Sequence, residues 1–145
     1  MSSDEWAREY AFEKSDPTRQ LLRGLLGQAD RLMRDAEATV ISVPLRYTAA
    51  HGAVLHLARL ALAAYGYRTL ENHHFWAIES LQHTLGLEDE LVAVLHEHRS
   101  KRHDAAYGAS PSVTETELRD LMDLATDLRA RILAWLEAER RDAWG

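Results

Sequence analysis

The segment with the densest collection of chemically useful side chains is 96–107, which reads HEHRSKRHDAAY. When this segment is helical, the apolar positions that precede it continue on one face into a histidine and then an arginine, in the order Leu91, Leu95, His98 and Arg102. A neighbouring stripe at four-residue steps holds Arg99, His103 and Tyr107. Arg102 is therefore predicted to continue the apolar face of this helix rather than to point simply into solvent.

These cations suit the binding of a phosphate group. The planar guanidinium of arginine binds phosphate through two parallel hydrogen bonds, and lysine adds a point charge. We predict a phosphate-binding set of Arg99, Lys101 and Arg102, with imidazoles beside it. Alternatively, cations near the C-terminal end of a helix complement its dipole and stabilise it by about 0.3 to 1 kcal/mol each. Tyr107 has a similar alternative, as a core aromatic residue whose hydroxyl group reaches the surface.

The elements that position this segment are predicted to be helices. Only 3 prolines and 7 glycines interrupt the chain, and apolar residues recur at spacings of three and four. Start and stop signals place helices from Asp16–Pro17, from Pro44 to Gly66, from about Glu71 to Leu85, from about Glu88 to about Ala105, and from Thr114 past Leu136. In the last of these, Thr114 and Glu117 form a capping-box pattern. The predicted fold class is all-α, an antiparallel four-helix-type bundle with an additional short helix.

Composition sets the domain organisation and excludes several classes of site. The chain of 145 residues is 46% hydrophobic and 28% charged, which is typical of a single globular domain. We expect a polar leader at 1–15, the bundle at 16–141 and a C-terminal tail at 142–145 with Trp144 on the surface. The absence of cysteine excludes disulfides and thiol chemistry. With no signal-peptide pattern and no bilayer-length apolar run, a cytoplasmic protein without a membrane partner is expected.

Net charge and histidine spacing limit the ligands. A net charge of −6 argues against a general nucleic-acid coat, although a local basic patch can still bind phosphate. The 8 histidines offer metal ligands in principle. However, His51 and His56 are separated by about 140° around a helix, and no Glu-x-x-His pair recurs on two helices. We therefore expect no metal site and no cofactor.

The chain resembles the HEPN families, which are small helical bundles of prokaryotic toxin–antitoxin and defence systems. The resemblance covers about Leu21 to Leu136. It is carried by Arg46-Tyr47-x-x-Ala50-His51, by Asn72-His73-His74, and by Leu95-x-x-x-Arg99-x-x-Arg102-x-x-x-x-Tyr107. In catalytic members, an arginine is followed after four to six residues by a histidine. These two residues lie at a dimer interface and cleave RNA without a metal ion. Arg102 matches that arginine, but Tyr107 stands where those members have histidine, and the pair of Arg99 and His103 is one residue short.

The resemblance implies a nucleotide-binding, RNA-binding or partner-binding component of a toxin–antitoxin or defence system. Its alternative is a metal-independent ribonuclease in which Arg102 stabilises charge, His103 or His98 acts as the base and Tyr107 orients the phosphate. Related operons encode a nucleotidyltransferase that modifies a tyrosine of the HEPN protein, which makes Tyr107 a candidate modification site.

The third alternative is a purely structural role in dimerisation or interaction. HEPN-like proteins pair across the helix that bears the arginine, so the resemblance implies a homodimer. Pairing brings two copies of Arg102 together, and two like charges in one cleft are unfavourable without an anion between them. A dimer of this kind therefore predicts an anionic ligand.

Overall fold

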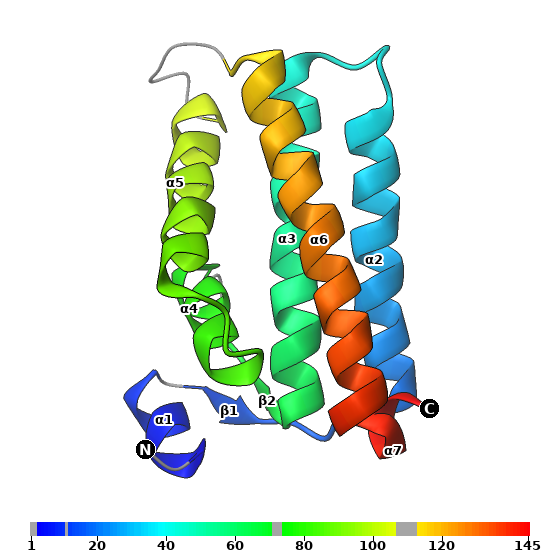
Figure 1. Ribbon diagram of the computed structural model, residues 1–145, viewed down its shortest axis with the longest axis vertical. Helices are drawn as coiled ribbons and strands as arrows, with labels where there is room; N and C mark the ends of the chain where they lie inside the picture. The colour runs from blue at the N-terminus through cyan, green and yellow to red at the C-terminus, as the bar shows by residue number, and fades with distance from the viewer. Residues whose placement is uncertain (1–2, 11, 71–73, 107–112) are drawn as a thin grey trace.

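Helices form nearly all of the regular structure, as the sequence predicts. The computed structural model describes residues 3–10, 12–70, 74–106 and 113–145. In chain order the elements are α1 (Ser3–Glu9), β1 (Glu13–Lys14), α2 (Arg19–Glu37), α3 (Val43–Tyr65), β2 (Tyr67–Arg68), α4 (His74–Thr84), α5 (Asp89–Ala106), α6 (Glu115–Glu139) and α7 (Arg141–Trp144). Figure 1 shows α2, α3, α5 and α6 running alternately up and down the molecule, with the shorter α4 between α3 and α5 in the chain. This is the predicted antiparallel bundle.

The central position of α3 follows from its sequence. Apolar residues cover most of its circumference, and it packs against α2, α4, α5 and α6. Pro44 lies in its first turn, where a missing backbone N–H is tolerated, and Gly66 ends it with a φ of 103°, a left-handed conformation that favours glycine. None of the described helices is long and apolar enough to cross a membrane.

The first bundle helix begins slightly later than predicted. The cap is Thr18, whose Oγ1 accepts a hydrogen bond of 3.1 Å from the backbone N–H of Leu21, and not Asp16. The predicted capping box of α6 is confirmed, because Thr114 Oγ1 accepts from the Glu117 N–H while a Glu117 carboxylate oxygen accepts from the Thr114 N–H. Both caps satisfy backbone donors that a helix start otherwise leaves unpaired.

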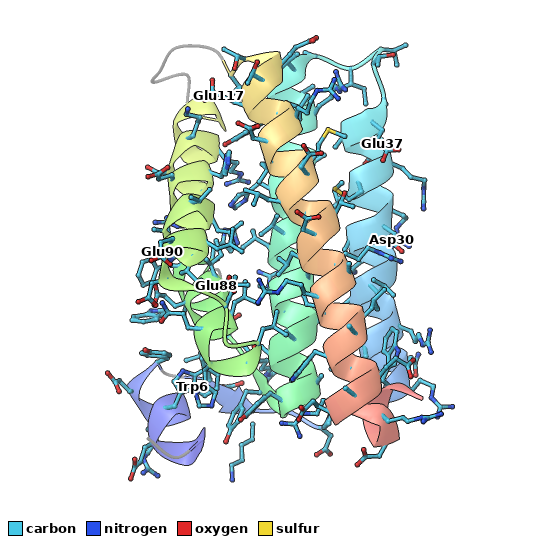
Figure 2. All side chains as sticks on the ribbon, viewed as in Figure 1. Trp6, Asp30, Glu37, Glu88, Glu90 and Glu117 are labelled. Atoms are coloured by element: carbon cyan, nitrogen blue, oxygen red, sulfur yellow. The ribbon has the colours of Figure 1, made fainter. Side chains whose placement is uncertain are left out.

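The N-terminal segment, predicted as a polar leader, contributes buried aromatic residues. Trp6 on α1 and Phe12 are 3% and 9% exposed. Figure 2 shows Trp6 at the end of the bundle where β1 and β2 lie. Trp6 stacks on His83 of α4, with ring centroids 4.1 Å apart, and β1 pairs antiparallel with β2. This two-stranded pairing was not predicted, because two-residue strands are too short to show an alternating pattern.

The C-terminal tail also packs onto the bundle, which corrects the expectation of a surface tryptophan. Trp144 is only 5% exposed. The guanidinium of Arg23 lies 3.9 Å from the centre of the Trp144 ring, and an Arg23 amino group donates to the Trp144 carbonyl oxygen at 3.3 Å. A cation over an indole ring and the burial of the ring together fix α7 against α2.

Candidate anion-binding site

The inner face of α5 carries the residues that the spacing predicts. Leu95 is buried, and His98 and Arg102 continue the same face at half-buried positions. This face is directed toward α3, with which α5 packs. The C-terminal half of α5 therefore presents an imidazole and a guanidinium to the central helix.

Tyr47 of α3 contacts His98 directly. The Tyr47 side chain is fully buried, and its hydroxyl oxygen lies 2.5 Å from His98 Nδ1 and 3.4 Å from the His98 carbonyl oxygen. Burial raises the pKa of Tyr47 well above its usual range, so the phenol stays neutral and keeps its proton. Burial also lowers the pKa of His98, with the charge of Lys101 adding to the effect. Both groups are therefore neutral near pH 7.

One turn further along α3, His51 is the most unusual residue of the core. It is 1% exposed, and neither Nδ1 nor Nε2 has a hydrogen-bond partner among the described residues. Burial, followed by the charges of Arg102, His74, His98 and Arg99, lowers the pKa of His51 to about 3. A buried polar group without a partner destabilises a fold by roughly 1 to 3 kcal/mol. The histidine is thus a neutral, unsatisfied donor and acceptor beside cations.

His74, the first residue of α4, is affected by the same arginines as His51. Burial lowers its pKa, followed by the charges of Arg59, Arg102 and Arg99. Three helices therefore contribute imidazole and guanidinium groups to one region. We call it the His51 cluster and define it as His51 of α3, His74 of α4, and Arg99 and Arg102 of α5.

Arg99 is held in place by aromatic and polar neighbours. Its guanidinium lies 5.5 Å from the centre of the Phe75 ring, and its Nε–H donates a long hydrogen bond of 3.4 Å to His96 Nδ1. His96 Nε2 in turn lies 2.8 Å from a carboxylate oxygen of Glu79. Phe75 of α4 is 40% exposed and stacks on His96.

The other predicted site residues fall outside this cluster. Lys101 forms an ion pair with Glu117 at the start of α6, so its charge is directed to a different helix from the one that holds His51. Figure 2 shows Glu117 at the end of α6 next to the last turn of α5. The side chain of His103 and the whole of Tyr107 lie outside the described residues.

No carboxylate among the described residues forms an ion pair with the arginines of the His51 cluster. The described charges that act on His51 and His74 are all cationic. Neither Arg99 nor Arg102 forms an ion pair with a described carboxylate, whereas Arg129 and Arg131 pair with Asp30 and Glu88. Like charges held together at half-buried positions repel one another unless an anion lies between them. The arrangement therefore suits an anion.

A metal ion is not what these residues select. Among the described residues, no group of three or more histidine, aspartate or glutamate side chains is placed to hold one. Guanidinium groups next to imidazoles repel a cation and attract phosphate.

Sequence reasoning missed the two residues of α3 that complete the site. The sequence places Tyr47 and His51 in the pattern that carries the family resemblance and offers His51 as a possible metal ligand, but it predicts neither as a site residue. The available signal was their spacing of four residues, which places both on one face of a helix that is otherwise apolar around them. The contribution of His74 depends on the placement of α4 against α5, which has no local signal.

Comparison of the chain with family models, curated proteins and solved structures finds no match. The resemblance to the HEPN families therefore rests on the residues that carry it.

Proposed function

We propose that this chain is a HEPN-like helical-bundle protein that binds the phosphate of a nucleotide or an RNA at the His51 cluster. The observation that carries the proposal is the buried imidazole of His51, which has no hydrogen-bond partner among the described residues and is acted on by the charges of Arg99 and Arg102 of α5. An anion at this position neutralises the repulsion between Arg99 and Arg102 and gives half-buried guanidinium groups the acceptors that they lack. A half-buried site strengthens each such hydrogen bond relative to one in water.

Binding is better supported than cleavage. A general base for attack by a ribose 2′-hydroxyl works best with a pKa near the working pH. Burial instead moves the pKa of His98 and of His51 downward, the latter to about 3, so both are weak bases near pH 7. In addition, His98 Nδ1 is engaged by the Tyr47 hydroxyl. Metal-independent ribonuclease activity remains the second candidate function, supported by the placement of Arg102 and His98 on one face of α5.

The proposal is tested by measuring the binding of adenosine 5′-monophosphate and of a 12-nucleotide single-stranded RNA to the parent protein and to Arg102→Ala. We expect the substitution to weaken both interactions roughly 10- to 100-fold, as for a hydrogen-bonded charge. The matched control is Arg141→Ala, which removes the same charge from an exposed position on α7. The proposal fails if the parent binds neither probe, or if the two variants bind alike.

Cleavage is separated from binding in the same reactions. The RNA is incubated with protein in the presence of a chelator and examined for fragments that end in a cyclic phosphate. Intact RNA together with measurable binding supports the binding module. Fragments that disappear in Arg102→Ala support the ribonuclease alternative.

We also propose that the chain forms a homodimer through α5. A groove of about 420 Å³ lies between α5 and α6 and is lined mainly by leucines, namely Leu87, Leu91, Leu95, Leu124 and Leu128. Val94, one turn from Leu91, is 36% exposed on the same helix. Light scattering on the protein as it elutes from a size-exclusion column tests the proposed dimer. A dimer is expected for the parent and a monomer for Val94→Glu. A monomeric parent would contradict the pairing.

The biological setting is tested in cells. A component of a toxin–antitoxin or defence system that is itself toxic arrests bacterial growth when expressed alone. We expect Arg102→Ala to relieve that arrest. A nucleotidyltransferase-type partner predicts a mass increase on Tyr107 when the two proteins are expressed together.

A further inference from the structure

We propose that the pocket where α2, α3 and β2 meet binds a small organic acid, with the carboxylate on Arg59 and the apolar chain between leucines of α2 and α3. The pocket has a volume of about 290 Å³. This is close to the lower end of the range of about 300 to 1,000 Å³ that small-molecule sites occupy. None of the residues of the His51 cluster lines it, so the inference does not depend on phosphate binding at that cluster.

Apolar side chains form most of the pocket wall. They are Leu21, Leu25, Leu62, Ala63, Tyr67 and Leu70. Leu62 and Tyr67 belong to the core and are 0% and 6% exposed, whereas Leu21 is 38% exposed. The wall therefore extends from the core to the surface, and an apolar chain that enters the pocket is removed from water.

Helical spacing aligns these side chains with one cation. Leu21 and Leu25 are one turn apart on α2. Arg59, Leu62 and Ala63 follow one another at spacings of three and four on α3, so they share the face that lines the pocket. Because α2 packs against α3, the guanidinium and the leucines surround the same space.

Arg59 is the group that selects an anion. Its side chain is half-buried, and it forms no ion pair with a described carboxylate. None of the described residues that line the pocket is acidic. Burial lowers the pKa of Arg59 below its usual value, as expected for a charge held partly away from water. A carboxylate accepts two parallel hydrogen bonds from such a guanidinium and balances its charge.

A single negative charge matches this pocket. Arg68 also lines it, but its guanidinium already binds the carboxylate of Glu13, with nitrogen–oxygen distances of 2.7 and 2.9 Å. Among the described lining residues, Arg59 is therefore the cation that is left for a ligand. One guanidinium beside an apolar wall fits a monocarboxylate with a carbon chain better than it fits a phosphate, which carries more charge and no apolar surface.

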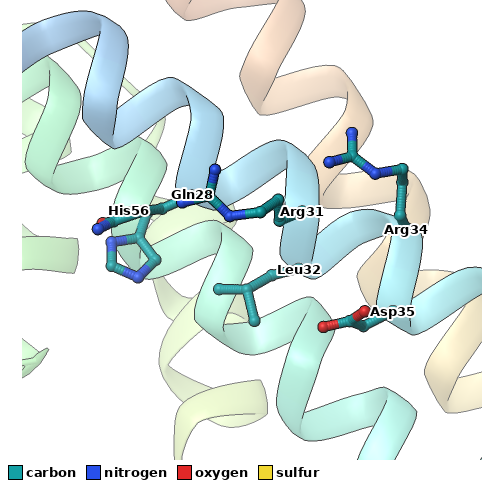
Figure 3. Close-up of a pocket in the computed structure, with 6 residues that line it drawn as sticks. All are labelled: Gln28, Arg31, Leu32, Arg34, Asp35 and His56. Carbon is teal, nitrogen blue, oxygen red and sulfur yellow. The ribbon is translucent and has the colours of Figure 1, made fainter.

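Two other grooves of the bundle each lack one of these features. Figure 3 shows a groove of about 570 Å³ further along α2 and α3, where Leu32 is surrounded by polar side chains, namely Gln28, Arg31, Arg34, Asp35 and His56. The leucine-lined groove between α5 and α6 includes Arg131, but this arginine donates to Glu88 at 3.1 Å. Of these three grooves, the pocket beside Arg59 combines an apolar wall with an unpaired cation.

The binding test uses octanoate and its neutral analogue octanamide, with backbone amide signals followed by nuclear magnetic resonance. The parent is expected to bind octanoate about tenfold more tightly than octanamide, as for a hydrogen bond to a charged group. From butanoate through hexanoate to octanoate, affinity should rise by up to about fourfold for each CH₂ group that enters the pocket. The amide signals of Leu25, Arg59 and Ala63 should shift on binding.

The variant Arg59→Gln should bind octanoate about tenfold more weakly than the parent and octanamide as the parent does. Its matched control is Arg34→Gln, which removes the same charge from an exposed position of α2; Figure 3 shows Arg34 directed away from His56. Leu21→Glu is a second variant at a partly exposed position of the wall. Its carboxylate repels the acid or pairs with Arg59, so octanoate binding should again be weaker. Thermal melting checks that each variant folds.

Several results would overturn the inference. These are an absence of octanoate binding, equal affinities of the parent for octanoate and octanamide, and equal octanoate affinities of Arg59→Gln and Arg34→Gln. Amide shifts at Leu91 and Leu124 in place of those at Arg59 would put the acid in the groove between α5 and α6. A short peptide that ends in leucine and binds more tightly than octanoate would indicate a protein C-terminus as the ligand. Displacement of octanoate by adenosine 5′-monophosphate would place the acid at the His51 cluster instead, whereas independent binding supports a separate site.

Discussion

His51 makes the stability of this protein depend on pH in a way that can be calculated. Burial, followed by the charges of Arg102, His74, His98 and Arg99, lowers the pKa of His51 from 6.5 to about 3. The unfolded chain therefore binds a proton at this residue between these two values, while the folded chain does not. Linkage then requires that stability falls as the pH is lowered through 6.5 and continues to fall toward pH 3. Between pH 7 and pH 5 the expected loss from this residue is about 2 kcal/mol.

The assay is urea unfolding at pH 7 and at pH 5 for the parent and for His51→Leu, which fills the same space with an apolar side chain. The variant is expected to be at least as stable as the parent at pH 7, because it removes a buried polar group without a partner. Its loss of stability between the two pH values should be smaller than that of the parent by about 2 kcal/mol, or about 4 to 8 °C in melting temperature. Histidines that do not interact with His51 contribute equally to both proteins and cancel in the difference. An equal pH dependence in parent and variant would show that His51 is charged or hydrogen-bonded in the folded protein.

Three further substitutions test the fold by denaturant unfolding. Gly24→Ala should stabilise the protein by about 0.5 to 1 kcal/mol, since the new methyl group in the interior of α2 meets no atom within 4 Å; a loss of stability would place Gly24 in a contact. Thr114→Ala should destabilise by about 1 kcal/mol through loss of the capping box, with Thr126→Ala, an exposed threonine within α6, as the comparison that should change less. Trp144→Ala should destabilise by about 3 kcal/mol because it removes the buried ring against which Arg23 packs; a change below about 0.5 kcal/mol would mean that α7 is frayed in solution.

The parts of the fold that follow from the sequence have local signals. The ends of α3 are set by Pro44 and Gly66, and the start of α6 by a capping box, so each was predicted close to its observed position. The termini have no such signals. Trp6 is buried by rings that come from α3, α4 and β2, and Trp144 by an arginine of α2. Their burial depends on contacts between residues far apart in the sequence, which helical periodicity does not report.

The candidate site likewise has residues that local sequence signals predict and residues that depend on contacts between distant parts of the chain. The inward face of α5, with His98 and Arg102, follows from spacing alone. The missing hydrogen-bond partner of His51 could not be predicted, because an imidazole on an apolar face is ordinarily satisfied by a hydrogen bond. Its lack of a partner depends on how α4 and α5 place His74 and Arg99 around it. A residue that destabilises the fold in this way is expected where function requires it.

The most direct test of the His51 cluster is a nuclear magnetic resonance titration of the histidine ring nitrogens with adenosine 5′-monophosphate. We predict that the signals of His51 and His74 shift and saturate together, and that neither shifts in Arg102→Ala. Signals of these two rings that stay unchanged at saturating nucleotide, or that shift equally in Arg102→Ala, would contradict phosphate binding at the His51 cluster.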